Sequence, residues 1–334
     1  MGRISLIKIL SACFILSLFA GGVMAQDIYP ARKGTFICAS EPGGGMDLVA
    51  RGVAPFLSKY LRELNPNAKG GEFEVKNMPG ASHAKAMNYV FTEAKPDGYT
   101  IGDFIRGNVY KFTYGQAKLP FDVREFTWLC SMGLNQRVLV CNKKKFSTWE
   151  QMIAASKKEP LTFECSSVGS SEQLDTIFLI EIAGIPGKLT FSGGSAQTLG
   201  SLMRGDTDVS LMDYTPVKAL IESKEINVLA TMTEKRILPD VPTISEKGFP
   251  EVLKLLGGEC GNRMVMAPPK LAPEAKRKLI DAFKKAFDDP EFKAFRGKVG
   301  ITLETCLDEK VRETIAEHAE SLRKMTPILK KYGL

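Results

Sequence analysis

The alternation of strand-like and helix-like segments constrains the fold of this chain more than any other feature of its sequence. A first series occupies 35–39, 48–61, 72–76, 84–94 and 99–102, and a second occupies 148–157, 161–165, 172–183, a strand near Leu189 and 198–203. Parallel strands need a crossover of a dozen or more residues, which is usually a helix. The alternation therefore predicts an α/β fold with largely parallel sheets, and the second series predicts a second α/β lobe.

The stretch CASEPGGGMDLVAR joins a predicted strand to a predicted helix through three consecutive glycines. Gly43, Gly44 and Gly45 carry no Cβ, so a ligand can approach the main chain closely. The helix that starts near Met46 offers free N–H groups and the positive end of its dipole. Asp47, in the first helical turn, can cap such groups. We predict an anion site, for a carboxylate or a phosphate, and the alternative is a tight turn without a ligand.

The glycine loop does not match the nucleotide-binding motifs. Met46 and Asp47 stand where a P-loop would place its lysine and hydroxyl residue, and Leu48 stands where GxGxxG would place its third glycine. A tightly bound nucleotide is therefore disfavoured.

A second loop of the same kind follows the predicted strand that ends at Cys165. It consists of Ser166 followed by Ser167, Val168, Gly169, Ser170 and Ser171. Small hydroxyl residues beside a glycine at a helix start can donate main-chain and side-chain hydrogen bonds to an oxyanion. Simple helix capping by Ser170 or Ser171 is the alternative.

The sequence offers little for catalysis or for a metal. Its two histidines, His83 and His318, have no neighbouring triad partners, no GxSxG elbow is present, and no CxxC pair occurs. We expect His318 at the edge of the packed face of a helix from Asp308 to Tyr332. Ser321-Leu-Arg-Lys324 fits SxxK by letter but falls inside that helix. We predict that the chain is not an enzyme, has no cofactor and has no metal site.

Residues 1–25 have the three-part layout of a secretory signal. Arg3 and Lys8 precede an apolar run, and small residues end at Ala25. We predict cleavage after Ala25 and export to the periplasm; a lipoprotein box ending at Cys13 is the competing interpretation. Removal of the two basic residues lowers the formal net charge from +7 to +5. The remaining charges are interspersed, so no nucleic-acid partner is predicted.

Six cysteines follow the predicted leader, and their pairing is left open. An exported protein can form disulfides. Cys130 and Cys141 would face each other if their segments paired antiparallel, while unpaired buried thiols fit equally well. The six are Cys38, Cys130, Cys141, Cys165, Cys260 and Cys306.

Seven short motifs, in this order, resemble one family over nearly the whole chain that follows residue 25. They are PGGGMDLVAR at 42–51, NMPGAS at 77–82, AKPDGYTIG at 94–102, SSVGSS at 166–171, FSGGS at 191–195, GDTDVSLMD at 205–213 and RILPDVPTISEKGFP at 236–250. The chain resembles the periplasmic solute receptors of tripartite tricarboxylate transporters, which include the Bug proteins.

The resemblance implies a two-lobed, type II-like periplasmic binding fold that holds a carboxylate in a cleft between the lobes. Carried over by position, the first-lobe contacts are Gly43, Gly44, Gly45, Met46, Asp47, Ala81 and Ser82. The second-lobe contacts are Ser167, Val168, Gly169, Ser170, Ser171, Gly193, Gly194 and Asp213. The chain departs from the family pattern in the second lobe, where it has TFSGG for PYKGG and Ser167-Val-Gly-Ser170 for GxGT.

The expected domain organisation follows from both arguments. Lobe 1 comprises 26–132 and 256–334, lobe 2 comprises 133–255, and the chain crosses between them in strands near 130–142 and 245–265. We expect a monomer that captures a di- or tricarboxylate, or a related organic acid, and delivers it to membrane permease subunits. The alternatives are a ligand-sensing receptor for a signalling partner and an exported hydrolase that acts on carboxylates.

Overall fold

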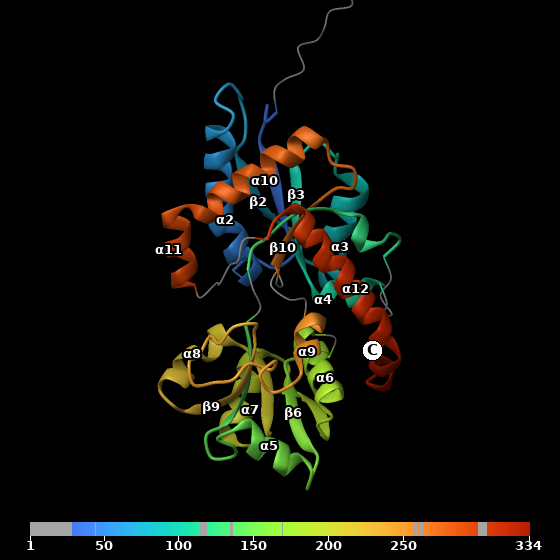
Figure 1. Ribbon diagram of the computed structural model, residues 1–334. Coiled ribbons are helices and arrows are strands. Elements are labelled where there is room, and N and C mark those ends of the chain that lie inside the picture. Colours follow the sequence, from blue (N-terminus) through green and yellow to red (C-terminus); the bar gives the residue numbers. More distant parts are fainter. Residues whose placement is uncertain are drawn as a thin grey trace, which may run out of the picture.

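The computed structural model describes residues 29–43, 45–113, 119–133, 136–168, 170–256, 260, 263–299 and 306–334. Within them, two five-stranded sheets lie one beyond the other along the long axis of the molecule, and helices flank each sheet (Figure 1). The predicted leader, Gly44 and Gly169 lie outside the described residues.

The first sheet has the strand order β2-β1-β3-β10-β4. Its strands are β1 (Gly34–Cys38), β2 (Phe73–Asn77), β3 (Thr100–Ile105), β4 (Thr127–Ser131) and β10 (Arg263–Ala267). β1 pairs in parallel with β2 and β3, while β10 runs antiparallel to β3 and β4. The predicted parallel units are therefore present, and one strand from late in the sequence completes the sheet.

The second sheet has the order β7-β6-β8-β5-β9. Its strands are β5 (Arg137–Asn142), β6 (Leu161–Cys165), β7 (Gly187–Phe191), β8 (Val209–Asp213) and β9 (Ile226–Met232). β6 pairs in parallel with β7 and β8, while β5 runs antiparallel to β8 and β9. The prediction of an α/β fold with two sheets is confirmed.

The helices follow the strands as the alternation predicts. They are α2 (Gly45–Glu63), α3 (Ala84–Asn88), α4 (Gly107–Thr113), α5 (Trp149–Ser156), α6 (Ser171–Ala183), α7 (Ser195–Arg204), α8 (Tyr214–Glu222), α9 (Pro250–Leu255), α10 (Pro273–Asp288), α11 (Pro290–Lys298) and α12 (Asp308–Lys331). The predicted helix 84–94 begins as α3 and continues as a π-helical turn, Tyr89–Glu93. No helix in the described part of the chain combines the length and hydrophobicity needed to span a membrane.

Apolar faces at helical spacing fix α2 and α10 against the first sheet. Val53 and Leu57 of α2 are completely buried, in the same cluster as Phe36 of β1 and Phe283 of α10. Because these residues recur every three to four positions, one side of each helix is apolar and the other is solvated. The packing leaves the amino end of α2 at the carboxyl end of β1.

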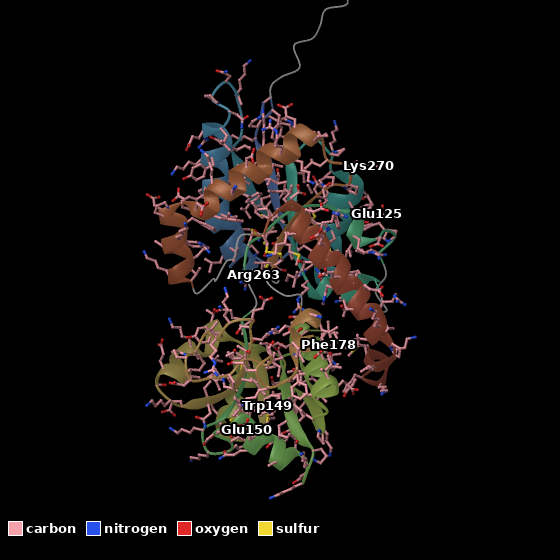
Figure 2. The ribbon with its side chains drawn as sticks, in the orientation of Figure 1. Glu125, Trp149, Glu150, Phe178, Arg263 and Lys270 are labelled. Carbon is pink, nitrogen blue, oxygen red and sulfur yellow. A yellow bond between two sulfur atoms is a disulfide. The ribbon has the colours of Figure 1, made fainter. Side chains whose placement is uncertain are left out.

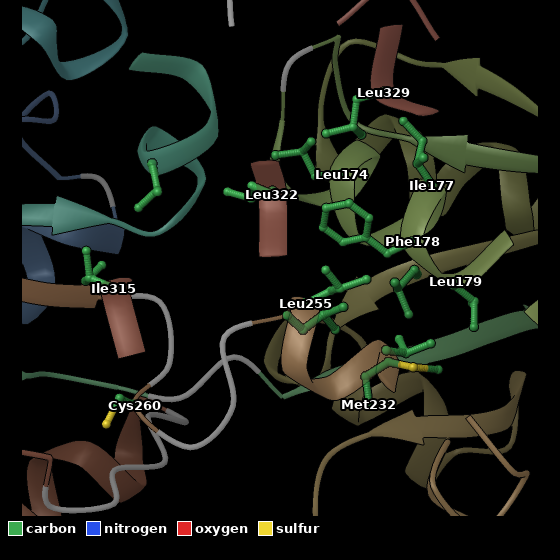
Figure 3. Close-up of a cluster of buried hydrophobic side chains, with 14 of the residues drawn as sticks. Leu174, Ile177, Phe178, Leu179, Met232, Leu255, Cys260, Ile315, Leu322 and Leu329 are labelled. Carbon is green, nitrogen blue, oxygen red and sulfur yellow. The ribbon is translucent and has the colours of Figure 1, made fainter. Parts of the chain in front are cut away.

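Helix α12 contacts elements of both sheets. It packs on β4 and α4 beside the first sheet and on α9 beside the second. Leu322 and Leu329 lie in one buried cluster with Leu174 and Phe178 of α6 (Figure 3). The Tyr332 hydroxyl, just after the helix, donates a hydrogen bond to Glu181 at 2.7 Å. The end of the chain is therefore anchored beside the second sheet.

The chain passes from one sheet to the other between β4 and β5, and returns between α9 and β10. Of the segment 245–265, predicted as a crossing strand, residues 250–255 are helical and only the part from Arg263 onward is strand.

One disulfide joins Cys260 to Cys306, 46 residues apart in sequence. Cys38, Cys130, Cys141 and Cys165 are free and buried. Cys130 and Cys141 lie on strands of different sheets, β4 and β5, so the antiparallel pairing that would bring them together does not occur.

Candidate functional site

The two sheets present the carboxyl ends of their parallel strands toward each other, and helices begin at those ends. α2 starts after β1 in the first sheet, while α6, α7 and α8 start after β6, β7 and β8 in the second. Open α/β sheets bind ligands outside the carboxyl ends of their strands, where the amino ends of helices offer free N–H groups. The glycine and serine loops of the sequence lie at these ends.

One short distance shows how closely the two ends approach, and a second joins two elements at the end of the first sheet. A Cβ built at Gly107, at the start of α4, would lie 3.5 Å from the Cβ of Ser171 at the start of α6. A Cβ built at Gly45 would lie 3.7 Å from Nη2 of Arg263, the first residue of β10. Residues distant in sequence thus meet where the sheets face each other.

Asp47 is buried and holds the glycine loop in place. Its Oδ2 accepts the main-chain N–H of Gly43 at 2.9 Å, Nε of Arg51 donates to both oxygens at 3.0 Å, and Asn77 donates to Oδ1 at 2.7 Å. Burial would raise the pKa of Asp47, but these hydrogen bonds outweigh burial and hold the pKa below its ordinary value. Asp47 is therefore an anion whose oxygens already accept hydrogen bonds from the protein, and these bonds hold the shape of the loop.

The backbone beside Asp47 needs its glycine. Gly43 has φ +81°, a backbone conformation that residues other than glycine adopt only with strain. Met46 is buried in the core, so its side chain anchors the start of α2. Ala81 and Ser82 lie in the short 3₁₀ turn Ala81–His83, and Ala81 has φ +46°.

Two hydroxyls of the serine loop, those of Ser170 and Ser171, are bonded to other groups of the protein. Ser170 is the N-cap of α6: its Oγ accepts the N–H of Gln173 at 3.2 Å and donates to the carbonyl of Ser167 at 2.7 Å. The Oγ of Ser171 accepts a hydrogen bond from Arg137 at 2.9 Å. The capping role considered for Ser170 is therefore the one observed, and Val168 is exposed at the tip of the loop.

Gly193 and Gly194 bring α7 close to the serine loop. The N–H of Gly193, at φ +94°, donates to the carbonyl of Ser166 at 2.9 Å. Gly194 is the residue before α7 and accepts the N–H of Thr198 at 2.9 Å through its carbonyl oxygen. A main-chain hydrogen bond thus joins the serine loop to the segment that leads into α7.

A buried arginine that the sequence analysis did not single out lies at the centre of the second sheet's end. Arg137 donates to Asp175 at 3.1 Å and forms ion pairs with Asp213 at 3.3 Å and Glu172 at 3.5 Å. Burial would lower its pKa, but the three carboxylates outweigh burial and raise it. A charge as the first residue of an otherwise apolar strand was the only sequence signal for this residue.

A second buried arginine joins the two sheets through the same carboxylate. Arg106, which follows β3, donates to Asp175 of α6 at 3.0 and 3.2 Å and to the carbonyl of Leu255 at 3.1 Å. Arg106 and Asp175 have side-chain exposures of 2% and 1%, so this ion pair is shielded from water. It is a fixed contact between the sheets.

Two histidines lie close to these groups. His318 is buried, and burial, with Arg106 adding to it, lowers its pKa well below the ordinary value, so it is a neutral histidine inside the packing rather than at its edge. His83 lies beside Asn108, 3.2 Å away. In the part of the chain that the structure describes, no three His, Cys, Asp or Glu side chains are grouped to hold a metal ion.

Comparison with known proteins gives a consistent assignment. The model of the tripartite tricarboxylate transporter family receptor matches residues 67–334. A Cupriavidus necator protein named "UPF0065 protein in gbd 5'region" is 27% identical, with 98% of this chain and 95% of that protein covered.

Solved structures share the fold. A TctC solute-binding protein from Polaromonas, without ligand, has a TM-score of 0.76 at 20% identity and covers 90% of this chain and 99% of its own. MatC from Rhodopseudomonas palustris, with bound malate, has a TM-score of 0.65 at 18% identity and covers 89% of this chain and 100% of its own. The likeness shows a common two-sheet architecture.

Proposed function

The chain belongs to the tripartite tricarboxylate transporter family of receptors, and we propose that it captures a small di- or tricarboxylate and delivers it to membrane permease subunits. The observation that carries this proposal is the meeting of helix starts from both sheets, α4 on one side and α6 on the other, at the facing ends of the strands, where α2 also begins. Such helix starts suit an anion. Malate, bound in the similar MatC, is a dicarboxylate of this kind.

In this proposal the two sheets are the cores of two lobes, with boundaries at 26–132 plus 256–334 and 133–255. The ligand lies between the glycine loop and the loops that begin α6 and α7, and Gly44 and Gly169 belong to the same contacts. A ligand shifts an open–closed equilibrium only by binding one state better, so contacts from both lobes are what would make closure ligand-dependent. The protein acts as a monomer in the periplasm after cleavage at Ala25.

A sensing receptor and an exported hydrolase are the other functions considered. A hydrolase needs a nucleophile or a general base that can reach the substrate. The hydroxyls of Ser170 and Ser171 are held by capping and by Arg137, and His318 is enclosed in the packing. Binding without catalysis is therefore the function that the site favours.

A thermal-shift screen tests the proposal. The wild-type protein is heated with mono-, di- and tricarboxylates, aromatic acids, acidic amino acids and phosphorylated compounds. A ligand at one hundred times its Kd stabilises the folded state by about 2.7 kcal/mol, so we expect the melting temperature to rise by several degrees with a di- or tricarboxylate. A shift with phosphorylated compounds alone would overturn the carboxylate assignment.

A pair of glycine variants locates the binding. Gly45→Val places methyl groups beside Arg263 at the start of α2, where the ligand would approach, and we expect the carboxylate-induced shift to disappear while the protein alone still melts cooperatively. Gly297→Val is the matched control, because that helical glycine has no heavy atom within 4 Å of an added Cβ. Equal shifts in both variants would place the ligand elsewhere.

A further inference from the structure

The two sheets share one strand arrangement. In each, the parallel strands are followed by a strand of opposite direction, β10 beside β3 in the first sheet and β5 beside β8 in the second. Both of these strands begin with an arginine, Arg263 in β10 and Arg137 in β5. The two arginines therefore occupy equivalent positions at the facing ends of the sheets.

Their cross-strand neighbours differ. Arg137 lies opposite Asp213, the last residue of β8, whereas Arg263 lies opposite Ile105, the last residue of β3. The side chain of Arg137 is neutralised by carboxylates, as described above. The isoleucine offers Arg263 no such partner.

The guanidinium of Arg263 forms neither an ion pair nor a hydrogen bond within the described part of the chain. It is half-buried, and burial together with Arg137 lowers its pKa, while Asp213 opposes this. An arginine nevertheless stays charged in proteins. Withdrawing a charge from water without a partner costs free energy, which an anionic ligand would offset.

The position of Arg263 is the one a carboxylate would reach. Its Nη2 lies 3.7 Å from the Cβ position of Gly45, at the first residue of α2, and Figure 2 shows Arg263 between the two sheets. Asp47, the anion in the first turn of α2, is already bonded by Gly43, Arg51 and Asn77. The unpaired guanidinium of Arg263 and the free N–H groups at the start of α2 are thus placed to bind one shared anion.

We propose that Arg263 binds a carboxylate of the ligand next to the start of α2, and that it makes the site select a carboxylate over a neutral group of the same shape. This inference rests on the proposed function and adds a residue that the sequence motifs did not include. A guanidinium matches a carboxylate with two parallel hydrogen bonds, which gives geometric selectivity as well as affinity.

Isothermal titration calorimetry tests the role of Arg263. Malate, succinate and citrate are titrated into the wild-type protein, and the tightest binder is then titrated into Arg263→Gln, Arg263→Lys and the exposed control Arg277→Gln. A charge-assisted hydrogen bond contributes about 1.5 to 3 kcal/mol, so we expect Arg263→Gln to lose about 10- to 100-fold in affinity. Arg263→Lys should lose less, and Arg277→Gln should match the wild type.

Two further readings separate the possible failures. Without ligand, Arg263→Gln should melt at or above the wild-type temperature, because it removes an unpaired charge; a clearly lower temperature would indicate a structural role and overturn the inference. Unchanged affinity in Arg263→Gln would overturn the inference while the proposed function stands. If the wild type binds none of the three acids, the proposed function and the inference are both overturned.

Discussion

Replacing Asp175 by asparagine should weaken the protein more than any surface change. Asp175 is completely buried and accepts two hydrogen bonds from Arg106 and one from Arg137. In Asp175→Asn, Arg137 keeps Asp213, Glu172 and Ser171, but Arg106 keeps only the carbonyl of Leu255. Removing one partner of a buried ion pair costs about 3 to 5 kcal/mol, so we expect a loss of about 4 kcal/mol in the free energy of unfolding.

Urea unfolding at pH 7 measures this loss through the two tryptophans of the chain. Trp128 lies on β4 of the first sheet, and Trp149 opens α5 beside the second. The matched control is Asp281→Asn, whose exposed ion pair with Arg277 at 3.6 Å should matter by less than about 1 kcal/mol. Because Arg106 is the group left unpaired, the double variant Arg106→Met/Asp175→Asn should be more stable than the sum of the single losses predicts.

A loss below about 1 kcal/mol in Asp175→Asn, or strictly additive losses in the double variant, would refute this reasoning. Either result would mean that Arg106 finds water or another acceptor once the carboxylate is gone.

Two more predictions concern stability. Burial raises the pKa of Asp103 to about 6 from its ordinary 3.8, so the contribution of this carboxyl to stability is fully present below about pH 4 and is lost as the pH rises through 6. In urea unfolding, the free energy of unfolding of Asp103→Asn should therefore exceed that of the wild type by on the order of 2 to 3 kcal/mol at pH 8 but not at pH 3.5. Equal differences at both pH values would contradict this. Reducing the bond between Cys260 and Cys306, which closes a loop of 46 residues, should cost about 4 kcal/mol by the chain-entropy estimate, and Cys260→Ala/Cys306→Ala should be insensitive to reductant in the same assay.

Local patterns carried most of the fold prediction. The strand 161–165 and the helix 172–183 were predicted from apolar spacing and from the serine loop between them, and they match β6 and α6 closely. Such patterns are local because side-chain burial repeats every two residues in strands and every 3.6 residues in helices. Helix α9, within a predicted crossing strand, was missed because its apolar run is short.

The electrostatic part of the site was not predictable in this way. Arg106, Arg137 and Asp175 are 31 to 69 residues apart in sequence and meet only through the packing of two sheets. The pairing of Cys260 with Cys306 joins residues 46 apart in sequence and depends likewise on tertiary packing. Asp47 was placed correctly at a helix start, and its bond to Arg51 is a local i,i+4 contact within α2, yet its bond to Asn77 depends on the relative positions of α2 and β2.

Helix α12 adds a further connection between the sheets, besides the two passages of the main chain and the ion pair of Arg106 with Asp175. Any opening that swings the second sheet away from the first must either carry Leu329 and Tyr332 along or slide α6 past them. Packed helices slide by small shear displacements rather than separate. The axis of motion should therefore pass close to α12, and the entrance for a ligand should lie on the side of the molecule opposite that helix.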